Sequence, residues 1–219
     1  MPPILRLAHR GDWRHAPENS LPALVAGASA ARSDGLEFDV HLAADGTPVV
    51  IHDRSLRRVQ GVDHLVVALG VDDLAAHGVP SLVDALAAAP RTAFLDVELK
   101  VVPTAAVSVA LETARGPAPE RALVSAYLSD AHRALARLLP SWRRWLNRDW
   151  LDQAVVDEAL ALGCRGIAAR WRAITPASTR LVLDAGLELA AFTVRREATV
   201  RRLERLGVYA VCVEGSPLD

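Results

Sequence analysis

Residues 94–100 read Phe-Leu-Asp-Val-Glu-Leu-Lys, and residues 36–40 read Leu-Glu-Phe-Asp-Val. In both stretches charged side chains alternate with apolar ones, which is the period of a β-strand. Because alternate side chains of a strand point to opposite faces, Asp96, Glu98 and Lys100 share one face. In a barrel this charged face is the interior, whereas at the edge of an open sheet it faces water.

Short apolar runs alternate with helical patterns along the chain, which predicts parallel strands joined by right-handed crossovers. If the strand at 49–52 forms a hairpin with the strand at 36–40, eight strands remain, the number that closes a (β/α)8 barrel. We therefore predict an α/β fold, a TIM-type barrel in one domain over residues 1–219, with a short extra strand and insertion between its second and third strands. Strands are expected at 4–8, 36–40, 49–52, 93–99, 122–126, 144–147, 166–169, 189–194 and 209–213, and helices at 21–32, 104–114, 130–139, 151–162, 176–185 and 197–206.

An open, doubly wound sheet is the alternative architecture. Its usual dinucleotide signature is missing, since no Gly-x-Gly-x-x-Gly follows any of the expected strands. A chain of 219 residues is an ordinary size for one barrel, and we find no linker long enough to divide it.

Composition excludes several classes of partner. The net charge is −1 and 51% of residues are hydrophobic, so we expect neither nucleic acid nor an anionic membrane as a partner. No stretch approaches the ~18 apolar residues that span a bilayer, so no stable membrane insertion is expected. Cys164 and Cys212 fit neither a zinc motif nor a disulfide framework and are predicted to be buried free thiols. These features predict a soluble protein of a reducing compartment, the cytoplasm.

The carboxylates of the two charged strands predict a metal site. Glu37 and Asp39 are two residues apart and share a face, as Asp96 and Glu98 do. Burying several carboxylates without a partner is very costly, and a bound divalent cation relieves that cost. Hard oxygen ligands favour Mg²⁺ or Ca²⁺ over zinc. An edge strand with its polar face to water would explain one such pattern, but its repetition favours the metal.

Two histidines follow apolar runs directly. His9 comes after the run at 4–8, and His52 comes after the run at 49–51. Both are therefore expected at the carboxyl ends of strands, where barrel enzymes place their catalytic groups. A lone histidine in such a place is more often structural, but two beside a carboxylate cluster suit a general base and a general acid.

Several short motifs, taken in chain order, resemble the glycerophosphodiester phosphodiesterase family. Each motif is weak alone, but the ordered set is specific and covers nearly the first half of the chain. The motifs are His9-Arg10-Gly11, Pro17-Glu18-Asn19-Ser20, Glu37-Phe38-Asp39-Val40, Asp45-Gly46, Val49 to Asp53, Pro80-Ser81-Leu82 and Glu98-Leu99-Lys100.

The resemblance implies metal-dependent hydrolysis of a small-molecule glycerophosphodiester to glycerol 3-phosphate and an alcohol. It implies one divalent cation, Mg²⁺ or Ca²⁺, as cofactor, and Glu18 as a further candidate contact of that ion. The implied site residues are the metal ligands Glu37, Asp39 and Glu98; the acid–base pair His9 and His52; and the substrate- and phosphate-binding residues Arg10, Lys100, Glu18 and Asn19.

The second half of the chain departs from the family pattern. Phe192-Thr193-Val194-Arg195 stands where the family usually has Trp-Thr-Val-Asn, and Val213-Glu214 stands where it usually has Thr-Asp. These departures concern the far wall of the pocket and leave the leaving alcohol open, together with the choice of metal and the oligomeric state.

Three further questions stay open at this point. The segment 54–79 is a short insertion whose apolar stretch at 64–69 is expected to pack on the barrel, with capping of the pocket as the alternative. A lysophospholipase D-type enzyme would use the same residues behind a broad, apolar pocket mouth. A non-catalytic binding barrel is the third alternative, supported only by the altered second half.

Overall fold

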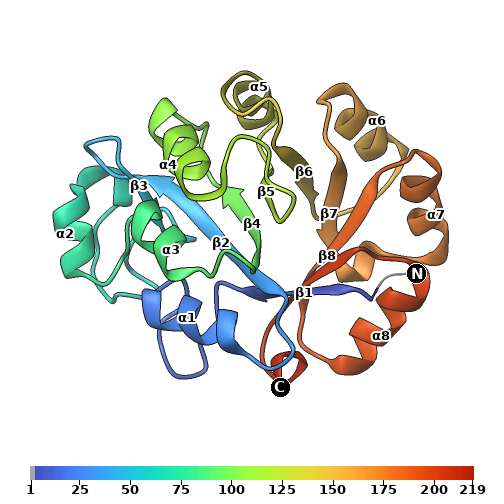
Figure 1. The fold of residues 1–219 in the computed structure, drawn as a ribbon, viewed down its shortest axis with the longest axis horizontal. Coiled ribbons are helices and arrows are strands. Elements are labelled where there is room, and N and C mark those ends of the chain that lie inside the picture. The colour runs from blue at the N-terminus through green and yellow to red at the C-terminus, as the bar shows by residue number, and fades with distance from the viewer. Residues whose placement is uncertain (1–2) are drawn as a thin grey trace.

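A computed structural model describes residues 3–219, and its strands close into a barrel surrounded by helices (Figure 1). The strands pair in the order β1-β9-β8-β7-β6-β5-β4-β2, and β1 also pairs with β2, so the parallel sheet returns onto itself. The barrel strands are β1 Leu5–His9, β2 Gly35–Leu42, β4 Phe94–Leu99, β5 Ala122–Ala126, β6 Arg143–Arg148, β7 Gly166–Arg170, β8 Glu188–Val194 and β9 Ala210–Val213.

The remaining strand, β3 (Pro48–Val50), lies outside the closed sheet and is antiparallel to the end of β2. β2 extends past its barrel partner, and Val40 to Leu42 pair with β3 in a hairpin. The predicted TIM-type barrel with one extra strand is therefore confirmed, and the open doubly wound sheet is wrong.

Helices alternate with the barrel strands, and two of them escaped the sequence prediction. α2 and α3 have only 6 and 7 residues, too few for an apolar period of 3.6 residues to repeat clearly. The helices are α1 Leu21–Ser29, α2 Val71–Ala76, α3 Leu82–Ala88, α4 Ala105–Arg115, α5 Ser129–Leu138, α6 Gln153–Ala161, α7 Pro176–Asp184 and α8 Glu197–Leu206, with single 3₁₀ turns at Val66–Ala68, Trp171–Ala173 and Ser216–Leu218.

The inner face of the barrel is apolar at the amino ends of the strands. Trp145 is wholly buried there and stacks on Phe94, with ring centroids 6.4 Å apart. A Cβ on Gly166 would lie 2.8 Å from the indole of Trp145, so the glycine makes room for this ring. We call this set the apolar layer; its members are Leu7, Phe94, Leu123, Trp145, Ala168, Ala190 and Ala210.

Two residues further along several of the same strands, the inner face becomes polar. On β4 Asp96 follows Phe94, and on β6 Asn147 follows Trp145, each with its side chain on the same face as its predecessor. We call this set the polar layer; its buried members are Glu37, Asp39, Asp96, Ser125 and Asn147, together with the half-buried Glu98.

The insertion after β3 has a small core of its own. Val66 is buried within it, whereas Leu65 and Val67 beside it are 55% and 61% exposed. The stretch 64–69 therefore packs as a loop with one 3₁₀ turn, and no residue of 54–79 lines the polar pocket described below. The buried members of this core are Ala43, Val49, Ile51, Leu56, Val66, Leu74 and Val79.

Two smaller expectations can be compared with the structure. Cys164 and Cys212 are both buried and unpaired, as predicted. Within residues 3–219, no helix has the length and apolar character needed to cross a bilayer.

Candidate active site

A polar pocket of about 520 Å³ opens at the carboxyl ends of the barrel strands. One wall comes from β1, β2, β4 and the segment after β3, and it contains most of the residues that the family resemblance implied. The opposite wall comes from the carboxyl ends of β7 and β8 and from the segments that follow β5, β7 and β8. The residues of the first wall are His9, Arg10, Glu37, His52, Asp96, Glu98 and Lys100.

Three carboxylates converge in this pocket. Glu37, Asp39 and Glu98 each offer one oxygen, and these oxygens all lie within 4.8 Å of one another. β2 and β4 pair in parallel with Asp39 opposite Glu98, which explains the close approach. Oε1 of Glu37 is buried without a hydrogen-bond partner, and such an atom calls for a water or a cation. The donor set therefore fits one divalent cation bound through oxygen. We call these residues the three-carboxylate group.

Electrostatics supports the same interpretation. Burial, together with the charges of Asp39 and Glu98, raises the pKa of Glu37 well above its usual value. Burial and the charge of Asp39 raise the pKa of Glu98 to about 7. Burial also raises the pKa of Asp96, beside the group on β4, to about 7. The carboxylates thus repel one another in a site that excludes water, and a divalent cation would favour their charged forms.

Two cationic side chains contact the three-carboxylate group. The Lys100 ammonium lies 2.9 Å from Oδ1 of Asp39 and also donates to Glu98. Nε of Arg10 lies 3.2 Å from Oδ2 of Asp39. Burial alone would raise the pKa of Asp39, but Lys100 and Arg10 outweigh it and hold that pKa well below the usual range. The structure thus brings both expected phosphate-binding cations to the site.

Glu18 and Asn19 are also brought to the site, but they do different things. Nδ2 of Asn19 donates to Oδ2 of Asp39 at 2.8 Å. Glu18 accepts from Arg10 at 2.7 Å and forms an ion pair with Arg58 from the insertion. Glu18 is not a member of the three-carboxylate group. Its contacts therefore favour a role in orienting Arg10 over a role as a metal ligand.

The loop between β1 and α1 has a strained backbone at two residues. Arg10 and Asn19 have φ values of 59° and 61°, in the left-handed region that non-glycine residues rarely adopt. The amide of Arg10 donates to the carbonyl of Glu37 at 2.8 Å, and the amide of Asn19 donates to the carbonyl of Arg10 at 3.0 Å. These bonds hold Arg10 and Asn19 over Asp39. Such strained positions cluster at functional sites because only a supporting structure keeps them in place.

His9 is the last residue of β1 and has a carboxylate on each side. Its Nδ1 lies 2.6 Å from Oε1 of Glu214, and its Nε2 lies 3.7 Å from Oε2 of Glu37. The other oxygen of Glu214 accepts from Nε of Arg195 at 2.6 Å. Burial would raise the pKa of Glu214, but its bonds to His9 and Arg195 lower it. Glu214 is therefore ionised and fixes the orientation of the His9 ring.

His52 reaches the pocket from the hairpin that lies outside the barrel. The extra strand expected at 49–52 ends earlier, at Val50, so His52 lies two residues beyond β3, which is outside the barrel as predicted. The hairpin turns back along β2, where the amide of Ile51 donates to the carbonyl of Asp39 at 3.0 Å. This bond places the next residue, His52, at the barrel mouth. Burial lowers the pKa of His52, so its imidazole is neutral near pH 7.

A carboxylate also holds His52. Its Nδ1 lies 2.6 Å from Oδ1 of Asp53, whose other oxygen accepts from Nε of Arg58 at 2.6 Å. His41 contacts the same segment, since its Nε2 lies 3.1 Å from the carbonyl of His52. His41 is therefore a local hydrogen-bonding residue.

Sequence reasoning gave no site role to Glu214, Asp53 or Arg58. A signal existed for the two acids, since Glu214 directly follows the last barrel strand and Asp53 directly follows His52. Arg58 carried no such signal, because its contact with Glu18 spans 40 residues and depends on the fold of the insertion.

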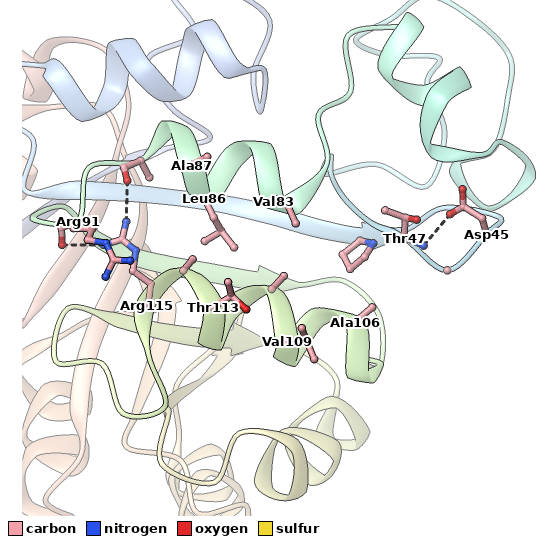
Figure 2. Close-up of a pocket in the computed structure, with 15 residues that line it drawn as sticks. Asp45, Thr47, Val83, Leu86, Ala87, Arg91, Ala106, Val109, Thr113 and Arg115 are labelled. Atoms are coloured by element: carbon pink, nitrogen blue, oxygen red, sulfur yellow. Dashed lines mark hydrogen bonds between the residues drawn. The ribbon is translucent and has the colours of Figure 1, made fainter.

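A separate apolar groove of about 680 Å³ lies between α3 and α4 and shares no lining residue with the polar pocket. Figure 2 shows Val83 and Leu86 of α3 facing Val109 of α4 across it, with Arg115 bonded to backbone carbonyls at one end. The groove contains none of the histidines or carboxylates described above, so the polar pocket is the candidate active site.

Comparison with known proteins agrees with this site. The profile of the glycerophosphoryl diester phosphodiesterase family matches residues 9–106. A Bacillus subtilis protein, YqiK, is 30% identical over 222 residues, covering 91% of this chain and 90% of its own. A glycerophosphodiester phosphodiesterase of Caldanaerobacter subterraneus is 37% identical over 70 residues, which is 32% of this chain and 28% of that protein.

A solved structure extends the similarity to the whole barrel. The phosphodiesterase of Oleispira antarctica, determined in complex with the product sn-glycerol 3-phosphate, is 25% identical. Its match has a TM-score of 0.85 and covers 95% of this chain and 92% of that one. Since YqiK aligns along nearly the full chain and the family profile begins at His9, the chain belongs to the glycerophosphoryl diester phosphodiesterase family of hydrolases.

Proposed function

We propose that the polar pocket hydrolyses glycerophosphodiesters to glycerol 3-phosphate and an alcohol by metal-dependent, paired-histidine catalysis. The observation that carries this proposal is the three-carboxylate group, with oxygens within 4.8 Å of one another, beside two histidines that are each held through Nδ1 by a further carboxylate. The product bound to the Oleispira antarctica phosphodiesterase supports the same product here.

Glu37, Asp39 and Glu98 would hold the divalent cation, with Mg²⁺ and Ca²⁺ as the candidates for oxygen ligands. When bound, this ion supplies positive charge to a phosphoryl oxygen and so stabilises the charge that develops during the reaction. The buried Oε1 of Glu37, which has no protein partner, supports this assignment.

Arg10 and Lys100 would bind the phosphate. Both already lie against Asp39, so a phosphate at the three-carboxylate group would lie within reach of both cations. The Arg10 guanidinium can bind two oxygens at once and so orient the phosphate, while Lys100 acts as a compact charge. Glu18 and Asn19 keep this arrangement through Arg10 and Asp39.

The two histidines would move the protons. His52, neutral near pH 7, suits the general base that takes the proton of the glycerol 2-hydroxyl, and His9 is then the general acid. The hydroxyl oxygen bonds to phosphorus while the bond to the leaving alcohol breaks, and His9 protonates the departing alkoxide. Water then opens the cyclic phosphate with the two proton transfers reversed, which yields glycerol 3-phosphate.

Turnover of the single variants His9→Ala and His52→Ala tests the proposal. General acid–base assistance is worth about 10²–10⁴-fold per group, so each substitution should lower kcat at least about 10²-fold. His64→Ala, at an exposed histidine outside the pocket, is the matched control and should keep the parent rate. Full activity in the double variant would refute the acid–base pair, and activity unaffected by EDTA would refute the metal.

The rival functions make different predictions for the same purified protein. A lysophospholipase D-type enzyme would prefer acylated glycerophosphocholine to the deacylated diester, whereas the first wall of this pocket is charged. A non-catalytic barrel would hydrolyse every diester at the background rate even when loaded with Mg²⁺ or Ca²⁺. Glycerophosphocholine and its acylated form, assayed side by side with both metals, separate the three outcomes.

A further inference from the structure

The polar pocket has a second wall that the proposed mechanism does not use. It is formed by the carboxyl ends of β7 and β8 and by the residues that follow β5, β7 and β8, across from the three-carboxylate group. Its side chains are aromatic or cationic, and we call this surface the far wall. Its residues are Tyr127, Arg170, Trp171, Arg172, Phe192 and Arg195.

The far wall carries more positive than negative charge. Arg170 is paired with Asp149 at 2.7 Å, and Arg195 is paired with Glu214 at 2.6 Å. Glu214 is already shared with His9, so its charge is divided between two partners. Arg172 makes no ion pair with any of residues 3–219, which leaves one guanidinium uncompensated at the pocket rim.

The aromatic surface of the far wall is also occupied by cations. The Arg172 guanidinium lies 4.5 Å from the centroid of the Trp171 ring, and the Arg202 guanidinium lies 5.7 Å from it. Recognition of a quaternary ammonium uses open aromatic faces, and tryptophan is the strongest of them. Two guanidinium groups therefore compete with a choline head group for this ring and repel it by charge.

This inference rests on the proposed function, which sets how the substrate is oriented in the pocket. If the glycerol arm and phosphate bind at the three-carboxylate group with Arg10 and Lys100, the other ester arm extends to the remaining wall. That wall presents Arg172 and an edge-to-face aromatic pair, Tyr127 and Phe192, whose ring centroids are 6.3 Å apart.

We propose that the far wall selects glycerophosphodiesters whose leaving alcohol carries a second anionic group, with Arg172 as the specificity-determining residue. The guanidinium of Arg172 pairs with that group, and its place on Trp171 disfavours a quaternary ammonium. The order of preference is an anionic head group, then a neutral polyol, then choline.

The experiment compares kcat/KM for three diesters that differ in head-group charge, with metal supplied. The probes are glycerophosphoinositol 4-phosphate, glycerophosphoglycerol and glycerophosphocholine. We expect the anionic probe to exceed the choline probe by about tenfold at low ionic strength, with the ratio shrinking as salt screens the exposed guanidinium. Arg172→Gln should reduce this ratio severalfold, and Arg172→Lys should keep most of it because the charge remains.

Arg180→Gln is the matched control, since Arg180 is exposed on α7 and does not line the pocket. Its ratio of anionic to choline substrate should equal that of the parent protein. Equal kcat/KM for the three probes, a preference for choline, or a ratio insensitive to Arg172→Gln would each overturn the specificity proposal while leaving the proposed hydrolysis intact. Failure to hydrolyse any of the three would instead refute the proposed function, and the specificity proposal with it.

Discussion

The two ends of the barrel interior are built on the same strands but from opposite kinds of side chain. On β4, Phe94 belongs to the apolar layer, and Asp96 and Glu98 belong to the polar layer. On β6, Trp145 and Asn147 divide in the same way. The apolar layer removes hydrocarbon from water and stabilises the fold, whereas the polar layer gathers carboxylates that repel one another. The residues that stabilise the fold and the residues of the candidate site therefore lie on the same strands, two positions apart along the barrel axis.

The largest expected effect comes from emptying the apolar layer. Trp145→Ala should lower the free energy of unfolding by about 3–5 kcal/mol, because a wholly buried indole leaves a cavity beside Phe94 and Tyr209. It also removes the bond from Nε1 to Glu188 at 2.8 Å. Urea denaturation measures the loss. Trp145→Phe, which keeps an aromatic ring, should lose less.

The same variant tests whether the two ends act separately. At a temperature where Trp145→Ala is folded, its kcat per folded molecule should stay within a few-fold of the parent value. A loss of activity comparable to that of the histidine variants would show that the apolar layer also sets the geometry of the polar one.

The next largest effect is the change in the free energy of unfolding with pH, which comes from the polar layer. The folded pKa of Asp96 is about 7, above its ordinary 3.8. Between these values the folded state keeps a proton that the unfolded state loses. The stabilising contribution is therefore present below about pH 4 and is lost as pH rises through 7. We expect the metal-free protein to lose about 2–4 kcal/mol over this window. Thermal unfolding after EDTA treatment measures this.

Asp96→Asn should make that pH profile shallower, because the amide cannot ionise while Glu37 and Glu98 still titrate. Asp72→Asn, at an exposed position on α2, is the matched control and should leave the profile unchanged. Added Mg²⁺ or Ca²⁺ should stabilise the parent protein more at pH 8 than at pH 5. A pH profile of metal-free Asp96→Asn as steep as that of the parent would contradict the buried, raised pKa of Asp96.

The smallest of these effects lies at the rim of the polar layer. Glu214→Gln should lower kcat about 10–100-fold with little change in KM, because Glu214 acts through His9 and not on the substrate. Glu214→Asp should recover part of the rate, since it keeps the charge that faces His9 and Arg195. A purely structural role would instead lower the melting temperature in both variants and leave kcat per folded molecule unchanged.

Much of the fold could be read from the sequence because the barrel strands are short, apolar on one face and bounded by turns. The paired carboxylates of β2 and β4 also revealed a shared face, since a strand period of two needs no tertiary information. α2 and α3 were missed because so few residues cannot display a helical period. The hairpin that carries His52 was predicted, but only the register of Ile51 with Asp39 shows how it brings His52 to the pocket.

The contacts between distant segments were beyond sequence reasoning. Glu214 meets His9 across 205 residues, and Arg58 meets Glu18 across 40. The local sequence around each residue does not predict its contact partner, because barrel closure and the fold of the insertion bring these segments together. The far wall could not be predicted either, since only the structure shows that Arg172 lies over Trp171 and lines the pocket.

The hairpin that carries His52 divides the proposed acid–base pair between two separately packed parts of the molecule. His9 is fixed to the closed sheet, whereas His52 belongs to a lobe with its own packed interior around Leu56 and Leu74. Surface loops of that lobe can be lengthened or exchanged without touching barrel closure, provided the register of Ile51 on β2 is kept. The lobe can therefore change in length while the strands that carry the three-carboxylate group keep their register.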